Sequence, residues 1–181
     1  MKKPILIASA LFAALILFYF VFEVIAPEKE EGIFQGERFL PLKATDIYAL
    51  DIVTREGLAL KCVRASDGSW NILEGEKKDN ASETIEDFLE AITIIPEIDT
   101  FTVAPDMLQQ YGLQEPSLRL TLTDLTRKTY DILIGDKTPA ASTGVYVNLS
   151  GSGRITILGA VLNWELFKLS SLFVFQDDLM E

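Results

Sequence analysis

The side chains in this sequence that could support chemistry are mainly carboxylates. Four of them, Asp131, Asp136, Asp177 and Asp178, would offer oxygen ligands to a hard cation such as Ca²⁺. Calcium loops, however, fix about six oxygens through a D-x-[DN]-x-[DN]-G pattern, and the sequence contains no such run. We therefore interpret these residues as solvated acidic surface and predict no metal site.

Nucleophilic and acid–base chemistry also lacks its usual residues. The chain of 181 residues contains no histidine, which removes the commonest general base and any Ser–His–Asp triad. Its single cysteine, Cys62, alternates with Leu58 and Leu60, so we predict a buried thiol with no disulfide partner in the chain. The number of acidic residues alone does not exclude a carboxylate pair for glycoside hydrolysis, but no spacing in the sequence indicates one. We predict no catalytic residue, no cofactor and no enzymatic activity.

Two glycine-containing segments resemble phosphate-binding loops only superficially. Neither Gly135-Asp136 nor Gly151-Ser152-Gly153 is followed by the Lys-[Ser/Thr] pair of a phosphate loop. No strand–loop–helix pattern surrounds them either, so we interpret both as turns.

The elements that would position these residues are mostly strands. Apolar residues alternate with polar ones in several short runs, the pattern of strands with one buried face. Asp67-Gly68 between two such runs is typical of a hairpin turn. Strands are predicted over residues 46–53, 58–62, 70–72, 97–103, 118–122, 130–134, 145–149 and 155–157.

The remaining patterns are helical. Residues 80–95 carry an apolar face of helical period, with a capping-box-like start at Asn80 and Glu83 and a stop at Pro96. A short helix at 105–110 ends at Gly112, and residues 161–169 also show a helical pattern. The predicted fold class is α+β, a mainly antiparallel sheet with two or three helices. The matching hairpins that begin at Leu58 and Leu118 leave open two related sheet units.

The N-terminal segment predicts a membrane anchor. Residues 5–22 are uncharged and, at ~1.5 Å per residue, cross most of a ~30 Å hydrocarbon core. The alternative is a cleavable signal peptide, but its apolar region would be shorter. The one suitable cleavage site, at residues 24–26, is followed by Pro27, which hinders a peptidase. We therefore expect an uncleaved span.

Charge predicts the orientation of this span. Lys2 and Lys3 precede it and Glu28, Glu30 and Glu31 follow it, so the positive-inside rule places the N-terminus in the cytoplasm. The predicted organisation is a cytoplasmic tip and transmembrane anchor at 1–26, a linker at 27–45 and an extracytoplasmic α+β domain at 46–181. In a bacterium with two membranes, this is a single-pass inner-membrane protein with a periplasmic domain.

The charge of the exported part limits its partners. Residues 27–181 carry 14 basic and 26 acidic residues, a formal net charge of −12. Nucleic acid and anionic lipid headgroups repel such a domain. We therefore predict no nucleic-acid partner.

Several segments, taken in order between residues 44 and 178, resemble a bacterial family called domain of unknown function 4340. Two departures are that many members repeat the unit, and that a basic–acidic pair after the last helix is Gln176-Asp177 here. The resemblance implies an N-terminally anchored extracytoplasmic domain, often linked with ABC-type export systems, and no catalytic residues. The matching segments are 60–64 with 67–70, 81–95, 111–117, 132–137 and 145–147.

Partner contacts are predicted at two places. Ala10 and Ala14 form a small-residue face on the span, where Glu23 marks the outer boundary. The apolar run Leu172, Phe173, Val174 and Phe175 either adds a strand to a neighbouring protein or closes the sheet of this domain.

Two functions follow from these expectations. The first is a non-catalytic accessory or scaffold subunit of a bacterial inner-membrane complex, whose partners are integral membrane subunits such as those of an ABC-type transporter. The second is a tethered periplasmic module that binds a small ligand, lipid or glycan. A concave apolar pocket with convergent polar groups would favour binding, and a flat exposed apolar patch would favour a scaffold.

Overall fold

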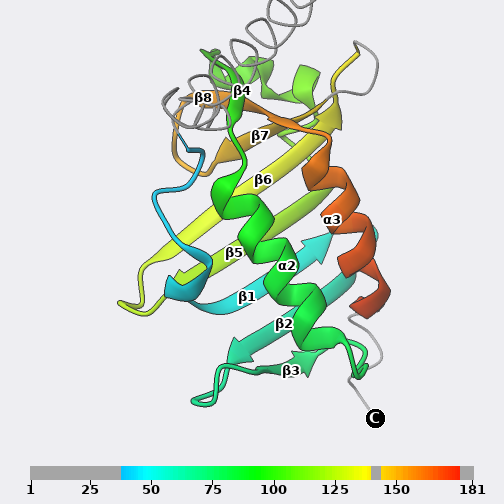
Figure 1. The fold of residues 1–181 in the computed structure, drawn as a ribbon. Coiled ribbons are helices and arrows are strands. Elements are labelled where there is room, and N and C mark those ends of the chain that lie inside the picture. The colour runs from blue at the N-terminus through cyan, green and yellow to red at the C-terminus, as the bar shows by residue number, and fades with distance from the viewer. Residues whose placement is uncertain (1–37, 140–143, 176–181) are drawn as a thin grey trace, which may run out of the picture. The chain divides into compact units, whose positions relative to one another are not determined.

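The computed structural model describes residues 38–139 and 144–175 (Figure 1). No helix within these residues is both long and apolar enough to cross a membrane. The predicted anchor, with Ala10, Ala14 and Glu23, lies outside the described residues. So do Gln176, Asp177 and Asp178.

The domain is built on one antiparallel sheet of nine strands. The strand order is β3-β2-β1-β5-β6-β7-β8-β4, and β9 pairs with β2 beside β3 (Figure 1). The strands are β1 Ile47–Thr54, β2 Leu58–Arg64, β3 Trp70–Glu74, β4 Glu97–Thr102, β5 Leu118–Asp124, β6 Thr129–Lys137, β7 Gly144–Leu149, β8 Arg154–Gly159 and β9 Val174–Phe175. This confirms the mainly antiparallel α+β prediction.

The two matching hairpins do not form separate sheets. Strand β1 pairs with β2 through Leu50 and Cys62, and with β5 through Leu50 and Leu122. The hairpins β2–β3 and β5–β6 therefore lie on opposite sides of β1 in one sheet. The alternative of two related sheet units is wrong because β1 joins them.

Two α-helices pack together over one face of the sheet, α2 Ala81–Ile94 and α3 Val161–Leu169 (Figure 1). Short 3-10 segments are η2 Ala44–Asp46, η3 Pro105–Tyr111 and η4 Ser170–Leu172. The predicted apolar face of α2 is buried, including Phe88. The predicted capping box is wrong, because the Asn80 side chain makes no capping hydrogen bond; instead Thr84 Oγ1 donates to the Asn80 carbonyl at 3.0 Å.

A polar cluster fixes the start of α2 to the sheet. Trp70 Nε1 donates to Glu86 Oε2 at 3.0 Å, and Arg64 Nη2 lies 2.9 Å from the same oxygen. The Arg64 guanidinium also lies over the Trp70 ring, 4.6 Å from its centroid. Trp70 and Phe88 belong to the same core.

Candidate functional site

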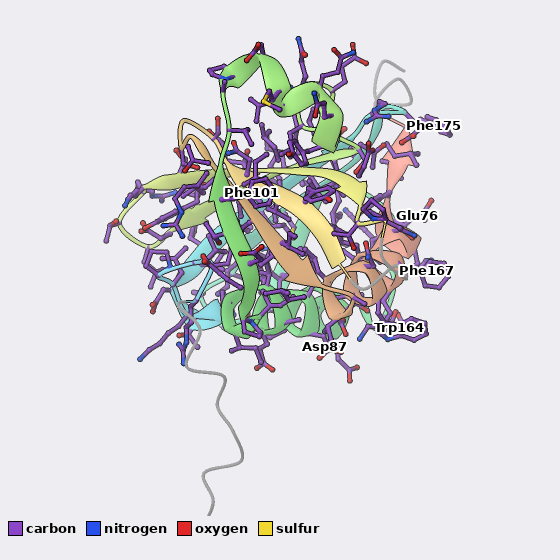
Figure 2. The ribbon with its side chains drawn as sticks, turned by 90° about the horizontal axis from the view of Figure 1, so that it is seen from above. Glu76, Asp87, Phe101, Trp164, Phe167 and Phe175 are labelled. Carbon is purple, nitrogen blue, oxygen red and sulfur yellow. The ribbon has the colours of Figure 1, made fainter. Side chains whose placement is uncertain are left out.

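Among the helices and strands that the structure describes, α3 leaves the most large apolar side chains exposed to solvent, and they lie on its outer face. Leu162 and Leu169 face the core, whereas Val161, Trp164 and Phe167 are exposed. Trp164 is 62% exposed and Phe167 70%, and both point away from the body of the domain (Figure 2). We call Val161, Trp164 and Phe167 the α3 stripe.

The composition of α3 explains why this stripe exists. The helix VLNWELFKL is apolar at most positions, so it cannot bury all of its apolar side chains against a single sheet. Positions three apart share a face, and the Trp164 and Phe167 rings stack with centroids 6.1 Å apart and planes at 30°. Two large rings held against each other in water make a rigid, amphipathic contact surface of the kind that is enriched at protein interfaces.

Apolar residues continue beyond the N-terminal end of the stripe. Ile94 at the end of α2 and Ile98 in β4 are both exposed. Ile98 Cδ1 lies only 3.7 Å from the position that a Cβ on Gly159 would occupy, close to the start of α3. The exposed apolar surface therefore reaches from α3 toward β4.

An acidic line runs along the neighbouring helix. Glu83, Asp87 and Glu90 are exposed on the outer face of α2, and we call them the α2 acidic stripe. Lys168 of α3 bridges toward it, 2.6 Å from Glu165 Oε2 and 3.4 Å from Asp87 Oδ2. Hydrogen bonding to Glu165 is the main cause that raises the pKa of Lys168, and Asp87 adds to it, so this lysine stays cationic.

The C-terminal segment lies mostly within its own domain. Leu172 is fully buried and Phe173 packs against the core, while Val174 and Phe175 pair with Ala59 and Leu58 of β2. The Leu172 carbonyl also accepts a hydrogen bond from Glu76 N at 2.8 Å. The segment therefore closes this sheet, one of the two alternatives left open. Of its four residues, only Phe175, 57% exposed, presents most of its side chain.

A polar pocket of about 280 Å³ lies where two of the sequence motifs meet. The Tyr111–Gly112–Leu113 turn packs onto Gly135 and Asp136 of β6, and Ser117 Oγ donates to the Ile134 carbonyl at 2.9 Å. The residues that line the pocket are Arg55, Gln109, Gly112, Gln114, Glu115 and Asp136. The Arg55 guanidinium donates to the main-chain carbonyl of Glu115.

This turn also explains an error in the sequence prediction. Gly135-Asp136 was interpreted as a turn after a strand that ends at residue 134, but β6 continues through Gly135 to Lys137. Glycine at 135 lets the backbone of Tyr111 approach the strand closely. Tyr111 in turn packs edge-on against Tyr146 of β7, with centroids 4.9 Å apart.

Of the candidate chemical residues, Asp131, Asp136 and Cys62 lie in the described part of the chain, and they do not come together there. No group of three acidic, cysteine or histidine side chains within residues 38–139 and 144–175 is arranged to hold a metal ion. Asp131 accepts a hydrogen bond from Thr121 Oγ1 at 2.7 Å, while Asp136 lies over Gly112. Cys62 is buried as predicted; burial, with the charge of Asp51, raises the pKa of its thiol to about 12, so it stays protonated.

The α3 stripe was not predicted from the sequence. The available signal was the pair Trp164 and Phe167, three residues apart within a short helical pattern, but nothing in that pattern shows which face is outward. Comparisons with protein-family models, curated proteins and solved structures found no match. The family resemblance therefore stays a prediction from the sequence motifs.

Proposed function

We propose that this chain is a non-catalytic accessory or scaffold subunit of a bacterial inner-membrane complex, with an ABC-type transport system as one candidate. The observation that carries the proposal is the α3 stripe. Two stacked aromatic rings that remain more than half exposed are typical of a surface that a partner covers. The predicted membrane anchor keeps this surface close to integral membrane subunits.

The character of the pocket supports the same choice. Small-ligand sites are usually concave and mostly apolar with a few converging polar groups. The pocket between Arg55 and Asp136 is instead lined by charged and amide side chains and one glycine. An exposed apolar surface together with a polar pocket favours a scaffold over a tethered binding module.

Co-purification of partners from native membranes tests this function. We expect the full chain, extracted in mild detergent, to bring integral membrane subunits with it, and the double variant Trp164→Ala/Phe167→Ala to lose most of them. Truncating aromatic anchors at an interface typically costs at least about 2 kcal/mol of binding energy. Because both rings are largely exposed, the variant should remain folded.

Leu125 provides the matched control. It is 62% exposed, as Trp164 is, but lies in the turn between β5 and β6. Leu125→Ala should keep the partners. A full chain without membrane partners, or a double variant that keeps them all, would contradict the proposal.

The proposed location has a separate test. We expect a reporter enzyme that is active only outside the cytoplasm to be active when fused after Glu181, because Lys2 and Lys3 hold the N-terminus inside. The same fusion with Lys2 and Lys3 changed to Glu should lose part of this activity. Activity of a cytoplasm-only reporter at Glu181 would reverse the proposed topology.

A further inference from the structure

We infer that the partner segment covering the α3 stripe is a basic amphipathic helix. This inference rests on the proposed function and adds the chemistry of the partner. It follows from the position of the α2 acidic stripe beside the α3 stripe, and from the charges that remain unneutralised there.

The two stripes run side by side in opposite directions. Figure 1 shows α2 and α3 antiparallel across the same face of the sheet, and Asp87 Oδ2 lies 3.4 Å from Lys168 Nζ. At one rise of ~1.5 Å per residue from this pair, Glu90 is about level with Glu165 and Ile94 with Val161. A segment that lies over the outer face of α3 would thus contact the exposed rings, which point away from Asp87 in Figure 2, and would have the carboxylates of α2 on its other flank, beyond Lys168.

The basic residues of this domain do not neutralise the α2 acidic stripe. Lys168 is shared between Glu165 and Asp87. Within the part of the chain that the structure describes, no basic side chain forms an ion pair with Glu83 or Glu90, and the domain as a whole is strongly acidic. A partner that covers Trp164 lies within the electrostatic field of these carboxylates on the neighbouring helix, so lysine or arginine on its flank is favoured and acidic residues are repelled.

The shape of this face favours a helix over a strand or a lipid surface. The outer face of α3 presents side chains and no unpaired strand edge, so a docking segment must satisfy its own backbone hydrogen bonds, as a helix does. Side chains of a third helix fit between the ridges of two packed helices. The exposed carboxylates on the neighbouring α2 oppose contact with anionic lipid headgroups.

The test uses fluorescence of the full chain in nanodiscs of the neutral lipid phosphatidylcholine. The chain has two tryptophans, of which Trp70 is buried and Trp164 exposed, so a blue shift on binding reports Trp164. The probes are two synthetic helical peptides with the same leucine face, one flanked by lysine and the other by glutamate. Trp164→Phe keeps an apolar ring and should abolish the shift, which checks the origin of the signal.

We expect the lysine peptide to bind about tenfold more tightly than the glutamate peptide at low salt, the ratio that two or three surface ion pairs supply. This preference should shrink as salt is raised. Glu83→Gln/Glu90→Gln should reduce it to about threefold, with the apolar contact retained. Equal affinity for both peptides, or a preference unchanged by the double variant, would overturn the inference.

Two further outcomes separate this inference from the proposed function. If Glu83→Gln/Glu90→Gln retains every native membrane partner while Trp164→Ala/Phe167→Ala loses them, the accessory role stands and the basic helix is wrong. If Trp164 emission in the nanodisc is already blue-shifted relative to detergent before any peptide is added, the α3 stripe contacts lipid and the inference is also overturned.

Discussion

Gly135→Ala should destabilise the domain by about 3 kcal/mol, the upper end of the cost of inserting a methyl group into a closely packed site. A Cβ at this position would lie 2.1 Å from the main-chain oxygen of Tyr111. The atom it would meet belongs to the backbone, so no side-chain rotation can relieve the overlap. The Tyr111–Leu113 turn would have to move away from β6, and with it the packing of Tyr111 on Tyr146.

The measurement is urea denaturation of the detergent-solubilised full chain followed by circular dichroism. Gly153→Ala is the matched control, because its Cβ would meet only Thr102 Cγ2, at an ordinary 3.7 Å, and its backbone needs no positive φ. The control should be neutral or slightly stabilising. Equal midpoints for both variants would show that the close approach at Gly135 does not limit stability.

Trp70→Ala should cost about 3–5 kcal/mol of unfolding free energy, as truncation of a large aromatic core residue does. The Trp70 side chain is 6% exposed, and its loss would leave a cavity in the core. It would also remove the indole donor to Glu86 and the ring beneath the Arg64 guanidinium. The Glu86 side chain of α2 would thereby lose its bond to β3, while the main-chain nitrogen of residue 70 would still donate to Ser82 Oγ.

Trp164→Ala is the internal comparison for this variant, since the residue type and the substitution are identical. Because Trp164 is mostly exposed, its truncation should change the unfolding free energy by no more than about 0.5 kcal/mol. Thermal melts of both variants in the same detergent give the comparison. Equal losses of unfolding free energy would mean that the α3 stripe stabilises the fold. Its exposed rings would then no longer indicate a surface that a partner covers.

The sequence predicted the elements better than their arrangement. Alternation identified strands such as β1 and β5, because a half-buried strand shows its period locally. The period of Ile85, Phe88 and Leu89 likewise identified α2 and its buried face. Alternation does not show which strands pair. Strands β2 and β5 have similar leucine-rich patterns, so the sequence does not reveal that β1 lies between them and pairs with both. Two matching hairpins therefore looked like two sheets.

The candidate interface was missed for a related reason. In α3, apolar residues occupy most positions and fall on more than one side of the helix, so hydrophobic period does not distinguish the side facing the sheet from the side facing water. Only the three-dimensional contact of Leu162 and Leu169 with the core leaves Trp164 outside. The structural role of Gly135 could not be predicted from the sequence either. A glycine that allows the backbone of another segment to pack closely against a strand has the same local sequence as a glycine in a turn.

The pairing of β9 with β2 also determines which part of the sheet can form last while the chain is being synthesised. Leu58 and Phe175 lie far apart in the sequence, and their bridge can form only after all the residues between them have been made. The pairings of β1 with β5 and of β4 with β8 are also non-local, although less distant in sequence, and such pairings are the topology of slowly folding domains. Until β9 arrives, Leu58 and Ala59 present an unpaired edge to other nascent chains. We expect chains truncated before Val174 to aggregate during expression in preference to accumulating as folded monomers.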